Sequence, residues 1–341
     1  MKPEVSERLF IEELFKKSMD ETNVDCPKIT NVERLTGDAS TRRYYRVHCS
    51  VQSYVVCLDN PSQDEFNSFV ETQKFFEKHD IKVPKVIHTD LSKGYLLEED
   101  LGDETLLKAL SSVNSKEAEL SVFKDIIEEL VKIHSIPLEE VSKSHIGKLK
   151  FDFEKLINEI DFTVDYFVGR FLGVEDEGLK RSLIEEFYPV CKRLSSQKMV
   201  CTHRDFHSRN IMVTDDKFMI IDFQDARLGI PQYDLASLLE DCYYDLNAEN
   251  RELLKRMYFE SLPEEVHGQK SFEEFQSLYR DMLLQRVFKA VGSFAYIYHH
   301  RKDHRYLKYI GFAMEKLKLA MLDQPDLKNL KHKLFDIYYD S

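Results

Sequence analysis

A segment in the second half of the chain, residues 199–222, combines short apolar runs with a polar loop. The loop has the sequence HRDFHSRN at positions 203–210, and Asp222 follows a second apolar run. This spacing places a carboxylate, Asp205, five positions before an amide, Asn210. Helical patterns flank the segment on both sides, so the sequence predicts a small β-rich insert within a mainly helical half of the chain.

The polar side chains of this insert suit phosphoryl transfer. A carboxylate on a tight loop can accept the proton of an incoming hydroxyl, and amide and carboxylate oxygens are ligands that Mg²⁺ prefers. Phosphoryl transfer depends mainly on positioning and on neutralising charge. We therefore expect Asp205 to act as the base, with Asn210 and Asp222 as ligands of a magnesium ion. The alternative is that all three are caps and turns of an unrelated α+β protein.

The first hundred residues predict a small antiparallel sheet. The expected elements are a helix over 4–19, strands over 28–35, 43–48 and 53–58, a helix over 64–79, and strands over 82–89 and 94–97. Beyond an acidic, loop-like stretch the apolar spacing becomes helical. The sequence thus predicts an α+β fold of two lobes. Residues 1–97 form the small lobe with one long helix, 98–103 a hinge, and 104–341 the larger, mainly helical lobe.

The motifs together resemble the protein-kinase fold, in which a His-Arg-Asp-x-x-x-x-Asn loop and an Asp-Phe pair hold the base and the metal. The chain is similar to the aminoglycoside phosphotransferase-like family, and most of all to its bacterial anomeric kinases of N-acetylmuramate and N-acetylglucosamine in cell-wall recycling. The similarity spans about residues 30–320. The stretches that carry it are GDASTRRY at 37–44, YLLEEDLGD at 95–103, the segment 203–239, DCY at 241–243 and QRVFKAVGSFA at 285–295.

This resemblance implies an ATP- and Mg²⁺-dependent kinase with a bilobal, protein-kinase-like fold and Asp205 as its base. His207 lies where protein kinases carry a lysine, so it either stabilises charge on the transferred phosphate or braces the loop. His203 and Asp234 are expected to support the loop. Contacts to the substrate are expected from a further set of polar residues: Arg209, Gln224, Asp225, Asp241 and Arg286.

The phosphate side of the first lobe departs from the kinase pattern. Gly37 stands alone, so Ser40, Thr41 and nearby backbone amides are left to hold the phosphates. Adenine is expected to meet the backbone of the hinge, where Glu98 and Asp100 are the candidate residues. The alternative for these two side chains is that they are solvated.

The third predicted strand, residues 53–58, lacks the lysine that contacts the α- and β-phosphates in kinases. We expect Arg42 or Arg43 to replace it, because a guanidinium can bind phosphate oxygens bidentately. Its helical partner would be Glu65 or Glu71. The alternative is that both arginines lie on the surface of a hairpin.

Composition narrows the class of partner. The chain has 48 basic and 61 acidic residues, a net charge of −13, which disfavours binding to nucleic acid. Six scattered cysteines indicate reduced thiols, and the sequence shows neither an apolar signal peptide nor a stretch that would span a membrane. We expect a cytoplasmic protein without a membrane partner. The oligomeric state stays open.

Several acceptors remain possible. The absence of tryptophan lowers the case for choline, whose ammonium group prefers an aromatic cage, whereas acidic residues suit an aminoglycoside or the hydroxyls of a sugar. N-acetylmuramate would need Arg209, Arg227 or Arg286 to meet its lactyl carboxylate. A non-catalytic nucleotide-binding protein is favoured by the missing lysine and opposed by the intact base and metal ligands.

Overall fold

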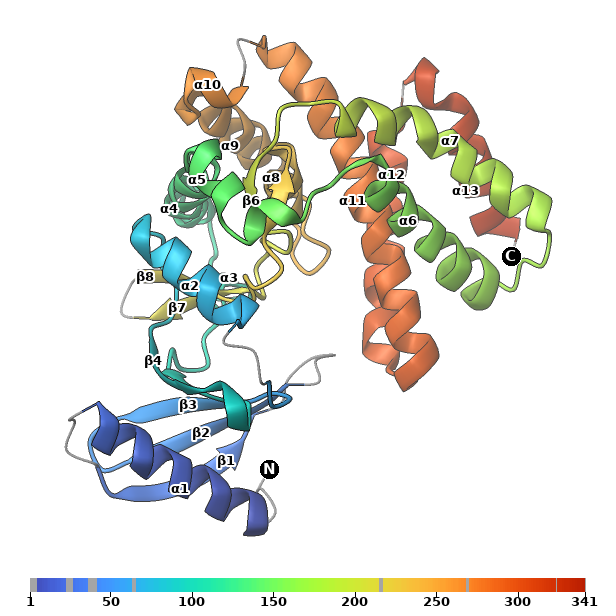
Figure 1. Cartoon of the computed structure of the whole chain (residues 1–341). Coiled ribbons are helices and arrows are strands. Elements are labelled where there is room, and N and C mark those ends of the chain that lie inside the picture. Colours follow the sequence, from blue (N-terminus) through green and yellow to red (C-terminus); the bar gives the residue numbers. More distant parts are fainter. Residues whose placement is uncertain are drawn as a thin grey trace. The chain divides into compact units, whose positions relative to one another are not determined.

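The computed structural model describes residues 5–22, 27–35, 42–62, 66–214, 217–267, 270–322 and 324–340. The chain forms two compact units (Figure 1). The first consists of residues 1–104 and 212–224, and the second of residues 105–211 and 225–341. Among the described residues, none of the helices combines enough length with enough apolar character to cross a lipid bilayer.

A five-stranded antiparallel sheet is the centre of the first unit, as the sequence predicts. Its strand order is β1-β2-β3-β5-β4. The strands are β1 (Ile29–Arg34), β2 (Arg43–Cys49), β3 (Ser53–Leu58), β4 (Val86–Asp90) and β5 (Tyr95–Glu99), with a 3-10 turn, η1 (Leu91–Lys93), between the last two. Gly94 adopts φ +63° between that turn and β5, and an added Cβ would lie 2.1 Å from the backbone oxygen of Asp59. Only glycine fits there.

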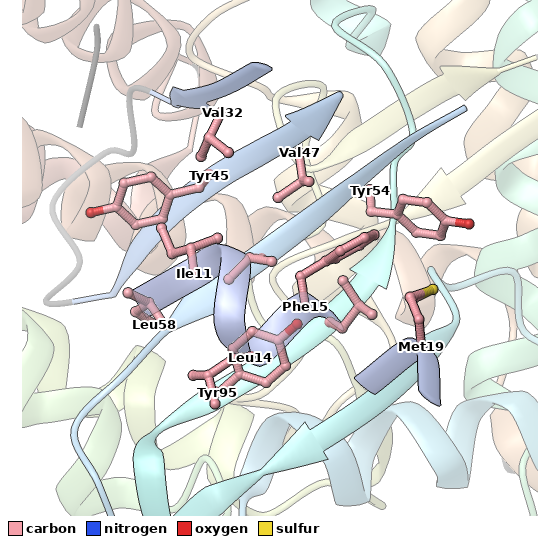
Figure 2. Packing of buried hydrophobic residues seen from close by; sticks show 12 residues of the cluster. Ile11, Leu14, Phe15, Met19, Val32, Tyr45, Val47, Tyr54, Leu58 and Tyr95 are labelled. Atoms are coloured by element: carbon pink, nitrogen blue, oxygen red, sulfur yellow. The ribbon is translucent and has the colours of Figure 1, made fainter. Parts of the chain in front are cut away.

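Helix α1 (Val5–Glu21) covers one face of this sheet. Side chains alternate along a strand, so Tyr45 and Val47 of β2 point to the same face, where they join side chains of α1 in one cluster (Figure 2). The Phe15 ring of α1 lies 5.3 Å from the Tyr54 ring. The cluster that results is the core of the first unit: Ile11, Leu14, Phe15, Met19, Val32, Tyr45, Val47, Tyr54, Val56, Leu58, Tyr95 and Leu97. The sequence predicts α1. It also leads us to expect that the helix over 64–79 packs on the sheet, and the structure corrects this second expectation.

That second helix is α2 (Ser68–Lys78). Asn67 caps its N-terminus, because the Asn67 side-chain oxygen accepts the N–H groups of Phe69 and Val70. The helix packs against the Asp-Phe motif instead. The rings of Phe69 and Phe223 are stacked at 4.8 Å. The two-stranded sheet of β7 (Ile211–Thr214) and β8 (Lys217–Ile220) leads into this motif.

The second unit is mainly helical. Its α-helices are α3 (Leu106–Leu110), α4 (Lys116–His134), α5 (Leu138–Lys143), α6 (Phe153–Thr163), α7 (Glu177–Ser195), α8 (Gln232–Leu239), α9 (Ala248–Ser261), α10 (Glu264–His267), α11 (Phe272–Arg301), α12 (Leu307–Ala320) and α13 (Lys328–Asp340). Its shorter elements are η2 (Ile146–Lys148), the π-helix η3 (Val164–Phe171), η4 (His304–Tyr306), η5 (Pro325–Leu327) and the strands β6 (Val200–Thr202) and β9 (Arg227–Gly229).

Helix α11 is the axis of this unit, since α6, α7, α8 and α12 all pack against it (Figure 1). Ser271 caps its N-terminus and forms a capping box with Glu274. Where α11 crosses α6, a Cβ on Gly292 would lie 2.7 Å from the Cα of Thr163. A glycine is therefore required for this close approach.

Four cysteines agree with the prediction of reduced thiols. Those that are free are Cys57, Cys191, Cys201 and Cys242. Cys26 lies outside the described residues.

Candidate active site

The predicted base lies on the 203–210 loop, which connects β6 to β7. Two short backbone hydrogen bonds fold this loop, from His207 N to the oxygen of Asp205 (3.1 Å) and from Asn210 N to the oxygen of His207 (2.9 Å). Arg204 adopts φ +87°, a conformation that a non-glycine residue keeps only when its surroundings enforce it, and that is common at functional sites.

Asp234 of α8 supplies those surroundings. Its carboxylate accepts the backbone N–H groups of His203 (2.6 Å) and Arg204 (2.9 Å). The buried His134 ring joins the same carboxylate at 3.1 Å, and its other nitrogen lies 2.5 Å from the hydroxyl of Tyr258. Charge-assisted bonds of this kind are strong when buried. Asp234 thus supports the loop, and His134 and Tyr258 are partners that the sequence analysis missed.

Asp241, expected at the substrate, also supports the loop. One of its oxygens accepts the N–H of Ser208 (2.9 Å) and the other that of Tyr243 (2.8 Å). The side chain is buried. The position of Asp241 therefore differs from the predicted one, because backbone donors engage both carboxylate oxygens.

Three cations surround the carboxylate of Asp205. Lys289 Nζ lies 3.3 Å and an Arg286 nitrogen 3.4 Å from Oδ1, both from α11, and Arg204 Nε lies 3.7 Å from Oδ2. Burial would raise the pKa of this carboxyl, but Lys289, Arg204 and Arg286 together hold it well below its usual range. Asp205 is therefore ionised at neutral pH, as a proton acceptor must be. Lys289 has no role in the sequence analysis.

Asp225 pairs with Arg204 at 2.5 Å, and its backbone oxygen accepts a hydrogen bond from Arg227 Nε (3.0 Å). The structure therefore brings Asp205 and Asp225 together at Arg204, and Arg286 contacts Asp205.

His207 and Arg209 lie against an aromatic group instead. The Arg209 guanidinium lies 4.8 Å from the centre of the Tyr243 ring and donates to the hydroxyl of Tyr306 at 3.4 Å. The His207 ring packs edge-to-face on the same tyrosine at 5.5 Å. Phe294 and Tyr309 complete the group. The sequence alone does not bring these aromatic residues together, since they come from the segment after α8 and from α11, η4 and α12.

The two predicted metal ligands lie in different units. Asn210 donates from its amide nitrogen to the backbone oxygen of Asp205 (2.9 Å), which turns the non-ligating end of the amide toward the loop. Asp222 is exposed, has φ +64° and accepts a hydrogen bond from Gln224 at 2.8 Å. Gln224, predicted at the substrate, belongs with Asp222 in the first unit. An amide oxygen and a carboxylate are hard donors that fit Mg²⁺.

On the nucleotide side the structure separates the two candidate arginines. The Arg42 side chain is 15% exposed, pairs with Asp59 at 2.8 Å and lies 5.8 Å from the ring centre of Phe69 in α2. The Arg43 side chain is 50% exposed and pairs with Glu7 of α1 at 3.0 Å. Arg42 directly precedes β2 and Arg43 is its first residue, so alternation of side chains along extended backbone explains why they face opposite ways.

Of the two predicted helical partners of the arginine, Glu71 is engaged elsewhere. Glu71 pairs with Lys74 of its own helix at 3.2 Å, so Asp59 at the end of β3 takes the place expected for it. Glu65 lies outside the described residues, as do Ser40 and Thr41.

The hinge carboxylates are engaged by the protein, which corrects the alternative that they are solvated. Glu98 is 6% exposed, and its burial raises the pKa of the carboxyl to about 7, against the lowering effect of Arg42. Asp100 binds Arg46 Nε at 2.7 Å and accepts the N–H of Gly102 at 3.0 Å.

A model of the family described as "Phosphotransferase enzyme family" matches residues 31–268, well over half of the chain. The chain belongs to the phosphotransferase enzyme family. It is 31% identical over 306 residues to a protein of Neisseria meningitidis serogroup B named N-acetylmuramate/N-acetylglucosamine kinase, with 89% of each chain covered. A protein of the same name from Pseudomonas aeruginosa is 29% identical over 304 residues, covering 86% of this chain and 85% of the relative.

Solved structures show the same fold. The gentamicin complex of APH(2")-IIa superposes with a TM-score of 0.61 at 18% identity, covering 93% of this chain and 99% of that one. Choline kinase LicA from Streptococcus pneumoniae superposes with a TM-score of 0.59 at 16% identity, covering 90% and 99%. The protein-kinase-like fold predicted from the motifs is confirmed.

Proposed function

We propose that this phosphotransferase carries the γ-phosphate of ATP to the anomeric hydroxyl of an amino sugar, N-acetylmuramate or N-acetylglucosamine. The observation that carries the proposal is an ionised carboxylate, Asp205, held at fixed geometry on a loop that also positions Asn210. The names of relatives that match over nearly the whole chain support the choice of sugar.

Asp205 would bind the acceptor hydroxyl and take its proton. Its three cationic neighbours make it a weak base, so it accepts the proton only when the oxygen–phosphorus bond is well formed. An anomeric hydroxyl is more acidic than an ordinary alcohol and suits such a base.

Asn210 and Asp222 would hold Mg²⁺. When bound, the ion neutralises charge on the phosphates. On the nucleotide side, Arg42 is the better candidate for the phosphate contact, because Asp59 and Phe69 hold its guanidinium in place, whereas Arg43 is tied to α1. Adenine would bind to the backbone of the hinge, whose path is fixed by the pairing of Asp100 with Arg46.

Of the three arginines considered for a lactyl carboxylate, Arg209 is the best placed. Arg286 is taken up by Asp205 and by the hydroxyl of Ser237, and Arg227 is buried beside Asp225. Arg209 is partly exposed and held by Tyr243 and Tyr306.

A coupled assay of ADP release tests the proposal. The acceptors are N-acetylmuramate, N-acetylglucosamine, choline and kanamycin, each with and without Mg²⁺. We expect turnover with an amino sugar, dependence on Mg²⁺, and an acid-labile sugar 1-phosphate as the product. Turnover with choline or kanamycin alone would contradict the choice of acceptor, and ATP binding without turnover of any acceptor would favour a non-catalytic protein.

A further inference from the structure

Lys289 is a partly exposed cation of α11 that has few hydrogen-bond partners. Its side chain is 14% exposed, and in the part of the chain that the structure describes its ammonium has one partner, Asp205 Oδ1, at 3.3 Å. An ammonium has three N–H donors, so two of them have no protein partner there. These donors are free to bind the oxygens of an anionic ligand.

Arg286, one turn earlier on α11, is in a different situation. It also contacts Asp205 Oδ1, but its Nε donates to the hydroxyl of Ser237 at 2.7 Å and its guanidinium lies 5.8 Å from the ring centre of Tyr233. Arg286 is therefore anchored from several sides and positions the carboxylate. The Lys289 ammonium has no second anchor of this kind among the described residues, because its hydrogen bond to Asp205 is the only one it makes there.

The distance from Lys289 Nζ to Asp205 Oδ1 indicates which ligand the remaining donors of Lys289 bind. A hydroxyl bound to a carboxylate oxygen lies about 2.7 Å from it. If both groups share Oδ1, the acceptor oxygen lies no more than about 6 Å from Lys289 Nζ. The phosphoryl group must arrive at that oxygen, and the charge on its three equatorial oxygens is what a nearby cation stabilises.

The loop itself offers no lysine for this task. The position two residues after the base holds His207, whose ring packs on Tyr243. Arg204 is engaged by Asp225. Of the cations around Asp205, Arg204 is also held by Asp225 and Arg286 by Ser237, whereas among the described residues the Lys289 ammonium bonds to Asp205 alone.

We propose that Lys289 binds the phosphoryl group while it is transferred to the hydroxyl held by Asp205, and is a catalytic residue supplied by α11. The inference rests on the proposed kinase function. In the step, the acceptor oxygen forms a bond to the γ-phosphorus as the bond to the β,γ-bridging oxygen breaks. The electron pair of that bond leaves with ADP, the hydroxyl proton passes to Asp205, and Lys289 keeps its protons.

Steady-state kinetics of Lys289→Met test this role. We expect kcat of Lys289→Met to fall about 10²- to 10³-fold, while KM for ATP and for the sugar changes by less than about threefold. We expect kcat of Lys289→Arg to be at least about tenfold higher than that of Lys289→Met. Arg301→Met removes an exposed cation from the end of the same helix and is expected to leave kcat unchanged. If Lys289→Met does not fold, Lys289→Gln replaces it with the same expectations.

A second measurement separates a catalytic from a structural role. ADP, Mg²⁺, aluminium fluoride and the sugar together mimic the transferred phosphoryl group, and their binding is followed by thermal shift. We expect wild-type protein to be stabilised beyond the effect of ADP and Mg²⁺, and Lys289→Met to lose only that increment. Loss of ADP binding as well, or an unchanged kcat, would overturn the inference. Wild-type protein without turnover would instead contradict the proposed function itself.

Discussion

Replacing Glu98 by glutamine should stabilise the protein above neutral pH. Glu98 lies on β5, is 6% exposed, and has a pKa of about 7 against an ordinary value of 4.5, because burial disfavours its charged form. Since the folded state binds this proton more tightly than the unfolded chain, the free energy of unfolding falls as the pH rises from about 4.5 to about 7.

The size of the effect follows from the two pKa values. The cost of the ionised carboxylate is about 3 kcal/mol at pH 8 and about 1 kcal/mol at pH 5. Glutamine keeps the shape of the side chain and never ionises, so Glu98→Gln should gain up to about 3 kcal/mol at pH 8. At pH 5 the gain in the free energy of unfolding should be about 2 kcal/mol smaller than at pH 8.

Urea denaturation of both proteins at pH 5 and pH 8 measures this difference. Glu71→Gln is the control, because the Glu71 side chain is 41% exposed and, among the described residues, forms an ion pair with Lys74 of the same helix alone. We expect the control to differ from wild type by less than about 0.5 kcal/mol at either pH. A difference between Glu98→Gln and wild type that is the same at both pH values would refute the argument from burial.

Three further predictions concern other parts of the molecule. Arg42→Met should weaken ATP binding at least tenfold by calorimetry, whereas Arg43→Met should change it less than twofold; equal effects would contradict the assignment. Asp234→Asn should cost about 3 kcal/mol in unfolding experiments, since one loop N–H then faces an amide NH₂, and a cost below 1 kcal/mol would rule out its supporting role. Gly292→Ala should destabilise by about 1–3 kcal/mol, while Gly311→Ala, with nothing within 4 Å of its added Cβ, should be neutral or stabilising by up to about 1 kcal/mol; the reverse order would refute the packing argument.

Local patterns predicted the elements well. The strands of the first unit and the helix α1 follow from apolar spacing, and the structure confirms them. The 203–210 loop is also a local feature, because the base and the amide are five residues apart and the chain between them is a tight turn.

Contacts between distant elements could not be predicted in this way. Lys289 and His134 meet their carboxylate partners across 84 and 100 residues of sequence, and helical periodicity does not say which neighbour a buried face will meet. Which of Arg42 and Arg43 is the candidate for the phosphate contact also depends on contacts between distant elements. Alternation predicts that they face opposite ways, but which side α1 covers depends on the packing of the whole unit.

Burial of charge was likewise invisible in the sequence. The acidic run at the hinge looks like a solvated loop, yet Glu98 belongs to a strand inside the sheet and Asp100 binds the buried Arg46. A carboxylate is placed in such a site by its neighbours in space, which no single sequence reveals.

The kinetics of Asp205→Asn test the proposed mechanism most directly. Asparagine keeps the shape of the side chain but cannot take a proton from the acceptor hydroxyl. Given a folded variant, we predict that turnover of the preferred amino sugar falls at least 10²-fold while the affinity for ATP and Mg²⁺ changes less than threefold. Turnover within a few-fold of wild type would show that Asp205 is not the base.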